Sequence, residues 1–426
     1  MTPPRVAFKT VGCRLNRAET ARMAAQFQAA GYQIVPYGEP CDVCVVHGCS
    51  VTQHAERTSV HFARHARHFP GKPFVVLAGC AAETARDSAS GPTGADLLAG
   101  RNGKFSLPAL IRNVRDAPAE AAQDATPEAP PLTPVFDTVR AWIKVQDGCD
   151  FHCAYCVVPF TRGAPRSRPA SEVLDEIRRV ADAGYKEIVL CGANLGCYVD
   201  GSRGLVSLLD RIEAIPSVER VRLGSIEMTT AEGAVIDFMA ASSKLCRFLH
   251  LPLQSGDDRV LKAMGRRYAS DDYRRSAGYA VERVPLLGLG TDVLVGFPGE
   301  DDAAYEASIR IIEELPFSNL HVFPYSKRRN TPAASMPRQI PEAVKKERVR
   351  RLVEIRNRKR AGFARQFIGR PVSVLVEERA DDGTATGWTG EYLEAAVLTP
   401  GCEPNQVVTL TPSTADGAVL RGEAVP

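Results

Sequence analysis

Cys149, Cys153 and Cys156 lie close together in the pattern C-x3-C-x2-C, with an aromatic residue directly before the third cysteine. Cysteine thiolates are the usual protein ligands of iron–sulfur clusters, which normally take four of them. Three thiolates on one loop can hold three irons of a [4Fe–4S] cube and leave the fourth iron open to a small molecule. A zinc site or three reduced thiols are the alternatives, but structural zinc usually takes paired C-x2-4-C units and a fourth ligand, and no second pair follows. The spacing therefore favours a cluster that can transfer an electron to a bound molecule.

A second set of three cysteines, the N-terminal cysteines, is spread over the first part of the chain. Cys13, Cys49 and Cys80 each come directly after a predicted strand. The loops at the carboxyl ends of parallel strands gather at one edge of an open α/β sheet, where ligands bind. These thiols can therefore meet in space as a second site, and the alternative is that they are structural cysteines, which are common in buried strands. The strands are predicted at 6–8, 32–35, 43–46 and 74–77, with a helix over 17–30.

Two further groups of potential ligands are interpreted as structural. Cys41 and Cys44 form a C-x2-C pair, but Cys44 lies inside an apolar strand and no helix begins after the pair, so a redox dithiol is not favoured. His61, His65 and His68 recur on one face of a predicted helix. Arginines surround them, which favours a solvated basic face over a metal site.

The C-x3-C-x2-C loop follows a predicted strand over 141–147, and strands then alternate with helices. One of these helices is predicted to be capped at Ser171 and to end before Gly184. About six such units in roughly two hundred residues predict a partial TIM-type barrel, with function at the carboxyl ends of its strands. The later strands are predicted at 187–190, 221–223, 248–251, 289–295 and 319–322.

The composition bounds the class of protein and its compartment. The chain has 426 residues, which predicts several domains, and its 44% hydrophobic and 24% charged content is that of an ordinary soluble protein. No apolar run is long enough to span a bilayer, and the N-terminus has no signal-peptide core. Twelve cysteines without an export signal indicate metal or redox chemistry in a reducing compartment. We therefore expect a cytoplasmic protein that does not associate with membranes.

The net charge is only +3, so any affinity for nucleic acid must come from a local patch. Residues 341–370 form such a patch, because they hold eleven Lys and Arg against three Glu, a local charge of +8. Val344, Leu352 and Ile355 belong to the apolar stripe of a helix in this segment. A solvated helix face is the usual explanation of a charge run, but this density without compensating acids favours contacts with phosphates.

Short β-type runs separated by turns end the chain and predict a small β-barrel. The predicted class is therefore α/β, with an N-terminal parallel sheet, a central partial barrel and a C-terminal β-barrel. The predicted boundaries are 1–115 for the sheet domain, 116–134 for a flexible Ala/Pro/acidic linker, 135–335 for the central barrel, 336–368 for a basic helical connector and 369–426 for the last barrel.

The order of these motifs resembles the radical SAM (S-adenosylmethionine) methylthiotransferases over essentially the whole chain. The last barrel resembles their RNA-binding TRAM domain, and residues 321–327 with 331–333 are most similar to the MtaB-type branch, which acts on N6-threonylcarbamoyladenosine in tRNA. His47 and Gly48 stand where the family usually has Asn-Thr. The matching stretches are 9–16, 49–52, 143–149, 251–256, 291–300 and 321–327.

This resemblance implies a transferase with two [4Fe–4S] clusters and SAM. The C-x3-C-x2-C cysteines would hold the cluster that cleaves SAM to a radical, and the N-terminal cysteines would hold an auxiliary cluster that carries the sulfur to be donated. Gly192, Asn194 and Gln254 follow barrel strands, where SAM contacts are expected. The reacting aromatic C–H bond has no acidic proton, so no acid–base catalyst is assigned.

The resemblance further implies that the enzyme adds a methylthio group to C2 of this adenosine, next to the tRNA anticodon. An electron donor such as flavodoxin or ferredoxin and a separate sulfur source are the other expected partners. The alternatives are a methylthiotransferase for isopentenyl-adenosine in tRNA, one for a ribosomal protein, and a non-enzymatic RNA-binding protein that holds zinc instead of iron.

Overall fold

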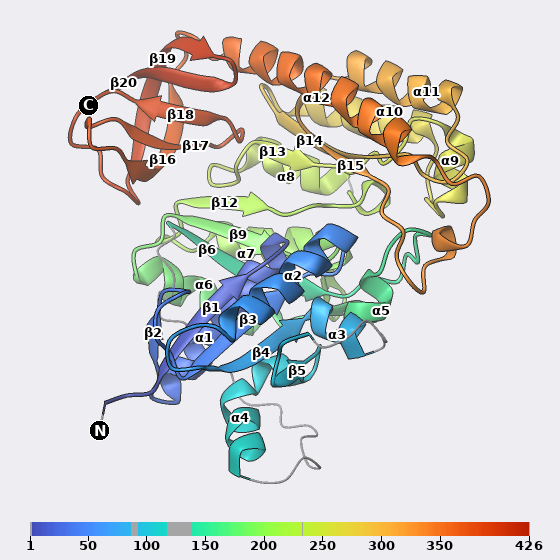
Figure 1. The fold of residues 1–426 in the computed structure, drawn as a ribbon. Helices are drawn as coiled ribbons and strands as arrows, with labels where there is room; N and C mark the ends of the chain where they lie inside the picture. Colours follow the sequence, from blue (N-terminus) through green and yellow to red (C-terminus); the bar gives the residue numbers. More distant parts are fainter. Residues whose placement is uncertain (1, 87–92, 117–138, 232, 426) are drawn as a thin grey trace.

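The computed structural model describes residues 2–86, 93–116, 139–231 and 233–425. It confirms the predicted α/β class, because a parallel sheet, an open barrel and a closed β-barrel follow one another along the chain (Figure 1). The expected linker over 116–134 lies outside the described residues except for Asp116, which ends a helix. None of the helices in the described ranges is long and apolar enough to cross a membrane.

The N-terminal domain is a five-stranded parallel sheet with helices on both faces. Its elements are β1 (Arg5–Thr10), α1 (Arg14–Ala29), β2 (Gln33–Val35), β3 (Val43–Gly48), α2 (Gln53–Ala66), β4 (Phe74–Gly79), α3 (Cys80–Arg86), β5 (Leu97–Ala99), η1 (Gly103–Phe105) and α4 (Leu107–Asp116). The strand order is β2-β1-β3-β4-β5. Helices α1 and α4 pack on one face and α2 and α3 on the other, which is why the strands are continuous apolar runs. Helix α1 begins three residues earlier than predicted, because Cys13 has the extended backbone of an N-cap.

The central domain is a sheet of six parallel strands in chain order. They are β6 (Arg140–Lys144), β9 (Glu187–Cys191), β12 (Arg220–Leu223), β13 (Phe248–His250), β14 (Gly288–Val295) and β15 (Phe317–Pro324). A parallel bridge between Val221 and Leu245 joins the first three strands to the last three. The result is the predicted partial barrel, with β6 and β15 at its two ends. The strand predicted over 141–147 stops at Lys144, because β7 (Gln146–Asp147) pairs with β8 (Arg166–Ser167) instead.

Helices cover the outer face of this barrel and share one apolar core with it. The prediction that Ser171 caps the first long helix is wrong. That helix begins at Ala170 after Pro169, and the carboxylate of Asp200 accepts the N–H of Ala170 at 3.0 Å. The helices and short connecting elements are α5 (Val158–Arg162), α6 (Ala170–Asp182), η2 (Leu195–Cys197), β10 (Val199–Asp200), β11 (Arg203–Gly204), α7 (Leu205–Glu213), η3 (Met228–Thr230), α8 (Gly233–Ala241), α9 (Asp258–Ala263), α10 (Ser270–Arg283), α11 (Asp302–Glu314) and η4 (Pro332–Ala334).

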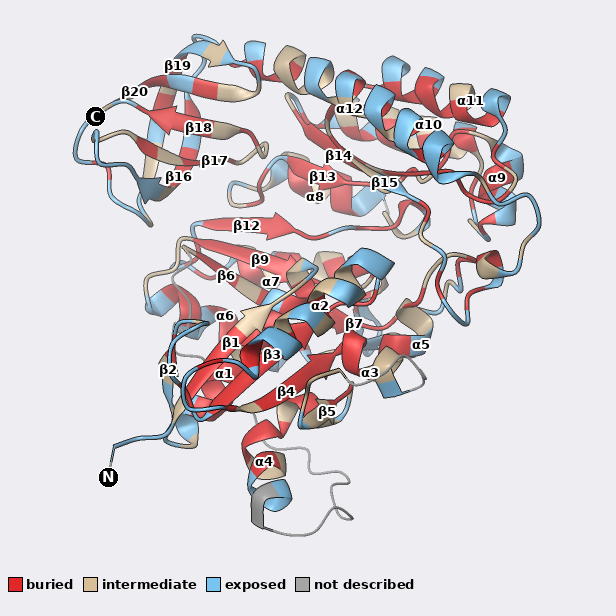
Figure 2. Cartoon of the chain, in the orientation of Figure 1, coloured by how far each residue is buried: buried red, intermediate tan, exposed pale blue. Residues whose placement is uncertain are grey.

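The basic segment is one long helix, α12 (Glu342–Arg365), which lies alongside α11 (Figure 1). Leu352 and Ile355 are buried against the central barrel, as predicted. Val344 is 37% exposed, contrary to the prediction, because the buried face runs through Lys345 and Arg348 instead. Figure 2 shows this alternation of buried and exposed residues along α12, whereas the barrel strand β14 is buried along almost its whole length.

The expectation that the charge of this helix lacks compensating acids is also wrong. Arg348 pairs with Glu300 at 2.5 Å, and Arg351 and Arg358 pair with carboxylates of α11. The two acids of α11 are each forty-five residues from their arginine in the sequence, and only the packing of α11 against α12 brings them close. Much of the local charge is therefore balanced by carboxylates from outside the basic segment.

The C-terminal domain is a closed barrel of five strands in the order β16-β17-β18-β20-β19. They are β16 (Val372–Arg379), β17 (Ala385–Thr389), β18 (Glu394–Val397), β19 (Val407–Asp416) and β20 (Val419–Val425). Strands β17 and β20 were not predicted, because Gly387 and Gly422 interrupt their β pattern. A side chain at either glycine would collide with the neighbouring strand, so the glycines permit close pairing.

This barrel is attached at the amino ends of the central strands, opposite the cysteine loop (Figure 1). Arg222 of β12 donates to the carbonyl oxygens of Thr389 and Gly390, at 2.9 and 3.0 Å. Gly288, the first residue of β14, lies against the backbone of Glu391. The turn between β17 and β18 therefore covers the amino end of the central barrel.

Candidate active site

The C-x3-C-x2-C loop begins where β7 ends, and its backbone brings the three thiols together. Gly148 has a φ of 73°, and a side chain there would collide with the carbonyl oxygen of Ala164. The N–H of Cys156 donates to the carbonyl oxygen of Cys153 at 2.9 Å, which closes the loop. Burial raises the pKa of Cys156 to about 12, and the thiols of Cys153 and Cys149 contribute to the rise. The three predicted ligands therefore share one small volume at the carboxyl end of β6.

Each N-terminal cysteine lies directly beyond a strand, as predicted. Cys13 caps α1 after β1, Cys49 follows β3, and Cys80 begins α3 after β4. Gly12 has a φ of 106°, and a side-chain carbon there would lie 2.8 Å from the sulfur of Cys49. Burial raises the pKa of Cys49 to about 11, and the thiols of Cys13 and Cys80 contribute to the rise. Three cysteines far apart in the sequence thus gather at one sheet edge.

Helix α1 covers the inner face of the first barrel strands. Leu15 packs against Val189 and Cys191 of β9, whereas Ile188 and Leu190 of the same strand point into the core under the outer helices. Burial raises the pKa of Cys191 to about 12, and the nearby thiol of Cys13 adds to this effect. Cys13 therefore faces the barrel interior.

The N-terminal domain also reaches the other end of the barrel. The N–H of Gln53 donates to the hydroxyl of Ser326 at 3.0 Å, and Arg328 pairs with Glu56. Both Ser326 and Arg328 lie in the loop that follows the end of β15 at Pro324. Because β6 and β15 are the two ends of the strand order, the N-terminal domain spans the open side of the barrel. The two cysteine sets consequently face one shared interior.

A buried charge network links the two sets. The carboxylate of Glu19 on α1 is fully buried, and it lies 2.7 Å from Lys104, 2.8 Å from Lys144 and 3.1 Å from Arg162. Arg162 ends α5, just after the C-x3-C-x2-C loop, and also pairs with Asp147 at 2.9 Å. Burial by itself would raise the pKa of Glu19, but Lys104 and Arg162 hold it well below its usual range. The ionised carboxylate thus ties α1 to the cysteine loop.

The same network contacts the N-terminal cysteines. Arg162 donates to the Asn16 side-chain oxygen at 2.8 Å, and the Cys13 sulfur lies 3.6 Å from that oxygen. Burial by itself lowers the pKa of Arg162, but Glu19 and Cys80 raise it beyond its ordinary value. His47, which departs from the family pattern, is fully buried, and its Nε2 lies 3.4 Å from Glu19. His47 is therefore a member of the same buried network.

Replacing Glu19 with Gln is expected to destabilise the fold by about 3–5 kcal/mol, because three buried cations then share no charged partner on α1. Denaturant unfolding at neutral pH measures the loss. The matched control is Glu39→Gln, which breaks an exposed pair with Arg5 and is expected to cost about 0–1 kcal/mol. Because the folded-state pKa of Glu19 is depressed, its contribution is present above the unfolded pKa of about 4.3 and is lost as the pH falls through the folded value. Equal effects of the two substitutions would contradict a role for the network.

Sequence reasoning missed a polar cluster in the barrel interior. His250 of β13, Asp292 of β14 and His321 of β15 place their ligand atoms within 4.8 Å of one another. Asp292 lies 3.1 Å from Nε2 of His250 and 3.5 Å from Nδ1 of His321. Burial by itself would raise the pKa of Asp292, but the two histidines hold it below its usual range. The sequence signal that could have revealed this cluster is a polar residue within each of three otherwise apolar predicted strands.

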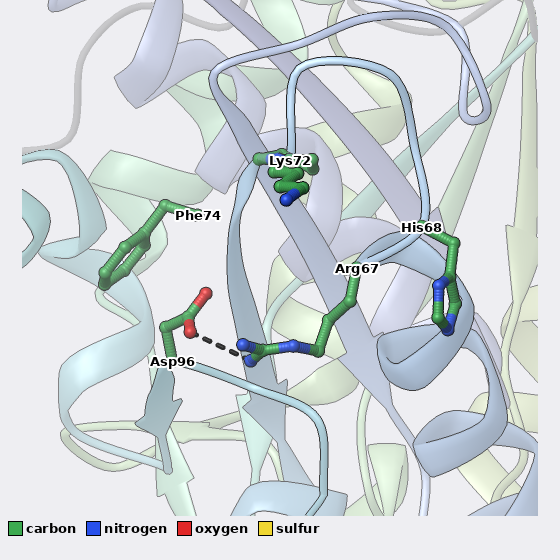
Figure 3. A pocket seen from close by; sticks show the side chains of 6 residues that line it. Arg67, His68, Lys72, Phe74 and Asp96 are labelled. Atoms are coloured by element: carbon green, nitrogen blue, oxygen red, sulfur yellow. Dashed lines mark hydrogen bonds and ion pairs between the residues drawn. The ribbon is translucent and has the colours of Figure 1, made fainter.

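Two other features lie away from this interior. Cys44 is buried in β3, and burial raises its pKa to about 12, which agrees with a structural cysteine. A hollow of about 540 Å³ lies at the amino end of β4, and Figure 3 shows Arg67 beside it paired with Asp96 at 3.0 Å. It is separated from Cys80 by the length of β4, roughly 20 Å, so it is not part of the candidate site.

Comparisons with known proteins agree with this arrangement. A model of the radical SAM superfamily matches residues 143–312, and a model of the uncharacterized protein family UPF0004 matches residues 5–100. Threonylcarbamoyladenosine tRNA methylthiotransferase MtaB of Bacillus subtilis is 32% identical over 91% of this chain and 89% of its own length. This chain belongs to the radical SAM methylthiotransferases.

Other members of the family carry two kinds of name. MtaB of Chlamydia pneumoniae is 35% identical over 87% of this chain and 87% of its own. A tRNA-2-methylthio-N(6)-dimethylallyladenosine synthase of Chlorobium chlorochromatii is 31% identical over 99% and 97%. Among solved structures, the radical S-adenosylmethionine methyltransferase TsrM from Kitasatospora setae has a TM-score of 0.56 over 78% of this chain and 75% of that one, at 16% identity. This similarity shows that the two proteins share a fold, and nothing more is inferred from it.

As a radical SAM methylthiotransferase, the protein is a transferase that uses SAM and a [4Fe–4S] cluster. The donor chemistry fits, because three thiols on one loop match a cluster that keeps one iron open. Arg266, which the sequence analysis did not single out, donates to the Cys153 sulfur at 3.4 Å and pairs with Glu227 at 2.6 Å. It places a positive charge beside the cysteine loop.

The three expected SAM contacts lie at the carboxyl ends of the barrel strands. Gly192 packs on the side chain of Gln146, whose oxygen also accepts the N–H of Asn194 at 3.0 Å. The side chain of Asn194 is buried, and its oxygen accepts the N–H of Glu227 at 3.3 Å, so it holds two strand-end loops together. Gln254 has a φ of 65° and extends the pairing beyond β13. Their contacts with SAM stay predictions.

Proposed function

We propose that this methylthiotransferase modifies tRNA, and that it adds the methylthio group to C2 of N6-threonylcarbamoyladenosine beside the anticodon. The observation that carries the proposal is the placement of two separate three-cysteine sets around one barrel interior. A reaction that needs both a radical and a sulfur donor requires such a pairing of sites. The MtaB relatives support the substrate, and relatives named for dimethylallyladenosine make that nucleoside the second candidate.

In this proposal each cysteine set holds one cluster. The C-x3-C-x2-C cysteines hold the [4Fe–4S] cluster, and the N-terminal cysteines hold a second one. When bound, these groups supply the radical from SAM and the sulfur for the new bond. Arg266 donates a hydrogen bond to the Cys153 sulfur and so places a positive charge beside one of these cysteines.

Two parts of the chain enclose the barrel interior, and a buried ion pair positions α1 beside it. The N-terminal domain covers the open side of the barrel, and the turn after β17 covers its amino end. Enclosure excludes water, which would consume a reactive intermediate. The Glu19–Arg162 contact holds α1, and with it Cys13, in register with the cysteine loop.

The substrate is tested with the reconstituted enzyme and anticodon stem-loops that differ only at N6 of one adenosine. The threonylcarbamoyl stem-loop is expected to give methylthio product at least tenfold faster than the dimethylallyl one, measured by mass spectrometry of the nucleosides. The reverse preference would support the second candidate. Modification of a ribosomal protein instead, with normal methylthio nucleosides in a deletion strain, would contradict a tRNA substrate.

A further inference from the structure

A cavity of about 480 Å³ lies where the central barrel, α12 and the C-terminal barrel meet. This size is within the range of sites for small organic groups. The residues that line it carry cations, aromatic rings and amide or aliphatic groups, but no carboxylate. Its main side chains are His321, Phe323, Arg356, Arg360, Trp388 and Tyr392.

The two arginines of the cavity differ from their neighbours on α12. Arg351 and Arg358 are paired with carboxylates of α11. In the part of the chain that the structure describes, no carboxylate lies within ion-pair distance of Arg356 or Arg360. Among the described residues, Arg356 donates to the side chain of the adjacent Asn357, at 3.2 Å, and the buried Nε of Arg360 has no hydrogen-bond partner. The cavity therefore presents two guanidinium groups that are available to bind an anion.

Burial lowers the pKa of Arg360, the adjacent charge of Arg356 lowers it further, and Glu394 opposes this only in part. Two cations in partly desolvated surroundings repel each other. A bound anion would relieve that repulsion, and the planar guanidinium fork matches a carboxylate in two hydrogen bonds.

The aromatic wall is rigid. Trp388 and Tyr392 stack with their ring centroids 4.9 Å apart. The hydroxyl of Tyr392 accepts a hydrogen bond from Arg14 of the N-terminal domain at 2.9 Å. The centroid of its ring lies 4.8 Å from the ring centroid of Phe248. Phe323 is 41% exposed beside the same cavity. Fixed aromatic faces next to arginines suit a nucleobase or a planar group attached to one.

The cavity adjoins the barrel interior through His321, which lines it and also contacts Asp292 at 3.5 Å. In adenine, C2 and the carbon that carries N6 lie on either side of N1 in the same ring. A substituent on N6 is therefore only a few bonds from the reacting carbon, and a site for it must lie within reach of the cysteine sets. The cavity meets this requirement, because Tyr392 in its wall accepts a hydrogen bond from Arg14, the residue after Cys13.

We propose that this cavity binds the threonylcarbamoyl group of the substrate adenosine, with Arg356 and Arg360 holding its carboxylate; this inference rests on the proposed function. The urea-like plane of the substituent lies against the aromatic wall. An uncharged dimethylallyl group would leave both guanidinium groups unpaired, and this gives the site its selectivity.

The test uses the reconstituted full-length enzyme and two stem-loops, one with the natural carboxylate and one with its neutral carboxamide. Binding is measured by fluorescence anisotropy at fixed salt. The wild type is expected to bind the carboxylate RNA about ten- to a hundredfold more tightly than the amide. In the double variant Arg356→Gln, Arg360→Gln this difference is expected to disappear, and Lys at both positions should restore part of it. Iron content verifies that the variants fold.

Arg275→Gln is the matched control, because this exposed arginine on α10 pairs with Asp272 away from the cavity. It is expected to retain the preference. If the double variant weakens both RNAs equally, the arginines contact backbone phosphate and the inference is wrong. An unchanged preference in the double variant would equally overturn it. Failure of the proposed function looks different, since the wild-type enzyme would then give no product from the threonylcarbamoyl RNA.

Discussion

Replacing Cys149, Cys153 and Cys156 together with Ala is expected to abolish reductive cleavage of SAM and to remove about half of the iron from the reconstituted protein. The physical reason is that a cluster held by three neighbouring thiolates on one loop has no other ligands there once they are gone. Iron and sulfide analysis, together with the yield of 5′-deoxyadenosine, measures both effects.

Cys402→Ala is the matched control, because this cysteine is buried in the core of the C-terminal barrel. It is expected to keep full iron content and SAM cleavage. Four irons in the wild type and none in the triple variant would contradict the second cluster. Persistent cleavage in the triple variant would contradict the assignment of this loop.

Changing Cys13, Cys49 and Cys80 together to Ala is expected to separate the two halves of the reaction. Methylthio product should fall below detection, since the proposed sulfur-carrying cluster loses its ligands. Reductive SAM cleavage should persist, because the three residues lie on a different domain from the C-x3-C-x2-C loop. Product nucleosides and 5′-deoxyadenosine are measured in the same reaction mixtures.

Cys44→Ala is the control here, because Cys44 lies on β3, in the same sheet, but in its buried interior. It is expected to retain product formation. If the triple variant still forms methylthio product, the N-terminal cysteines are structural. If the variant loses SAM cleavage and product together but retains the iron of one cluster, the two sites are not separable as proposed.

The local features of the candidate site could be predicted from the sequence alone. Cys149, Cys153 and Cys156 are close because the chain between them is short, so their spacing already implies one site. The N-terminal cysteines were also predictable, because a strand followed by a helix places its loop at one known edge of a parallel sheet. The fold class followed from the same strand–helix alternation.

The features that the sequence did not reveal depend on contacts between distant segments. Glu19 and Arg162 carry no local sign of their pairing, since only the docking of α1 against the barrel brings them within 3.1 Å. The charge of α12 illustrates the same point, because the acids that pair with Arg351 and Arg358 lie on α11. The sequence of α12 alone does not distinguish these paired arginines from Arg356 and Arg360.

The sequence by itself therefore determined the two cysteine sets, the α/β class and the order of sheet, open barrel and closed barrel, because these depend on short-range spacing and periodicity. Only the tertiary structure decided that the cysteine sets face one interior and that His321, Arg356 and Tyr392 share a cavity. Burial and electrostatic pairing are properties of the packed chain, and the charge of a single segment does not reveal which of its residues remain available for a ligand.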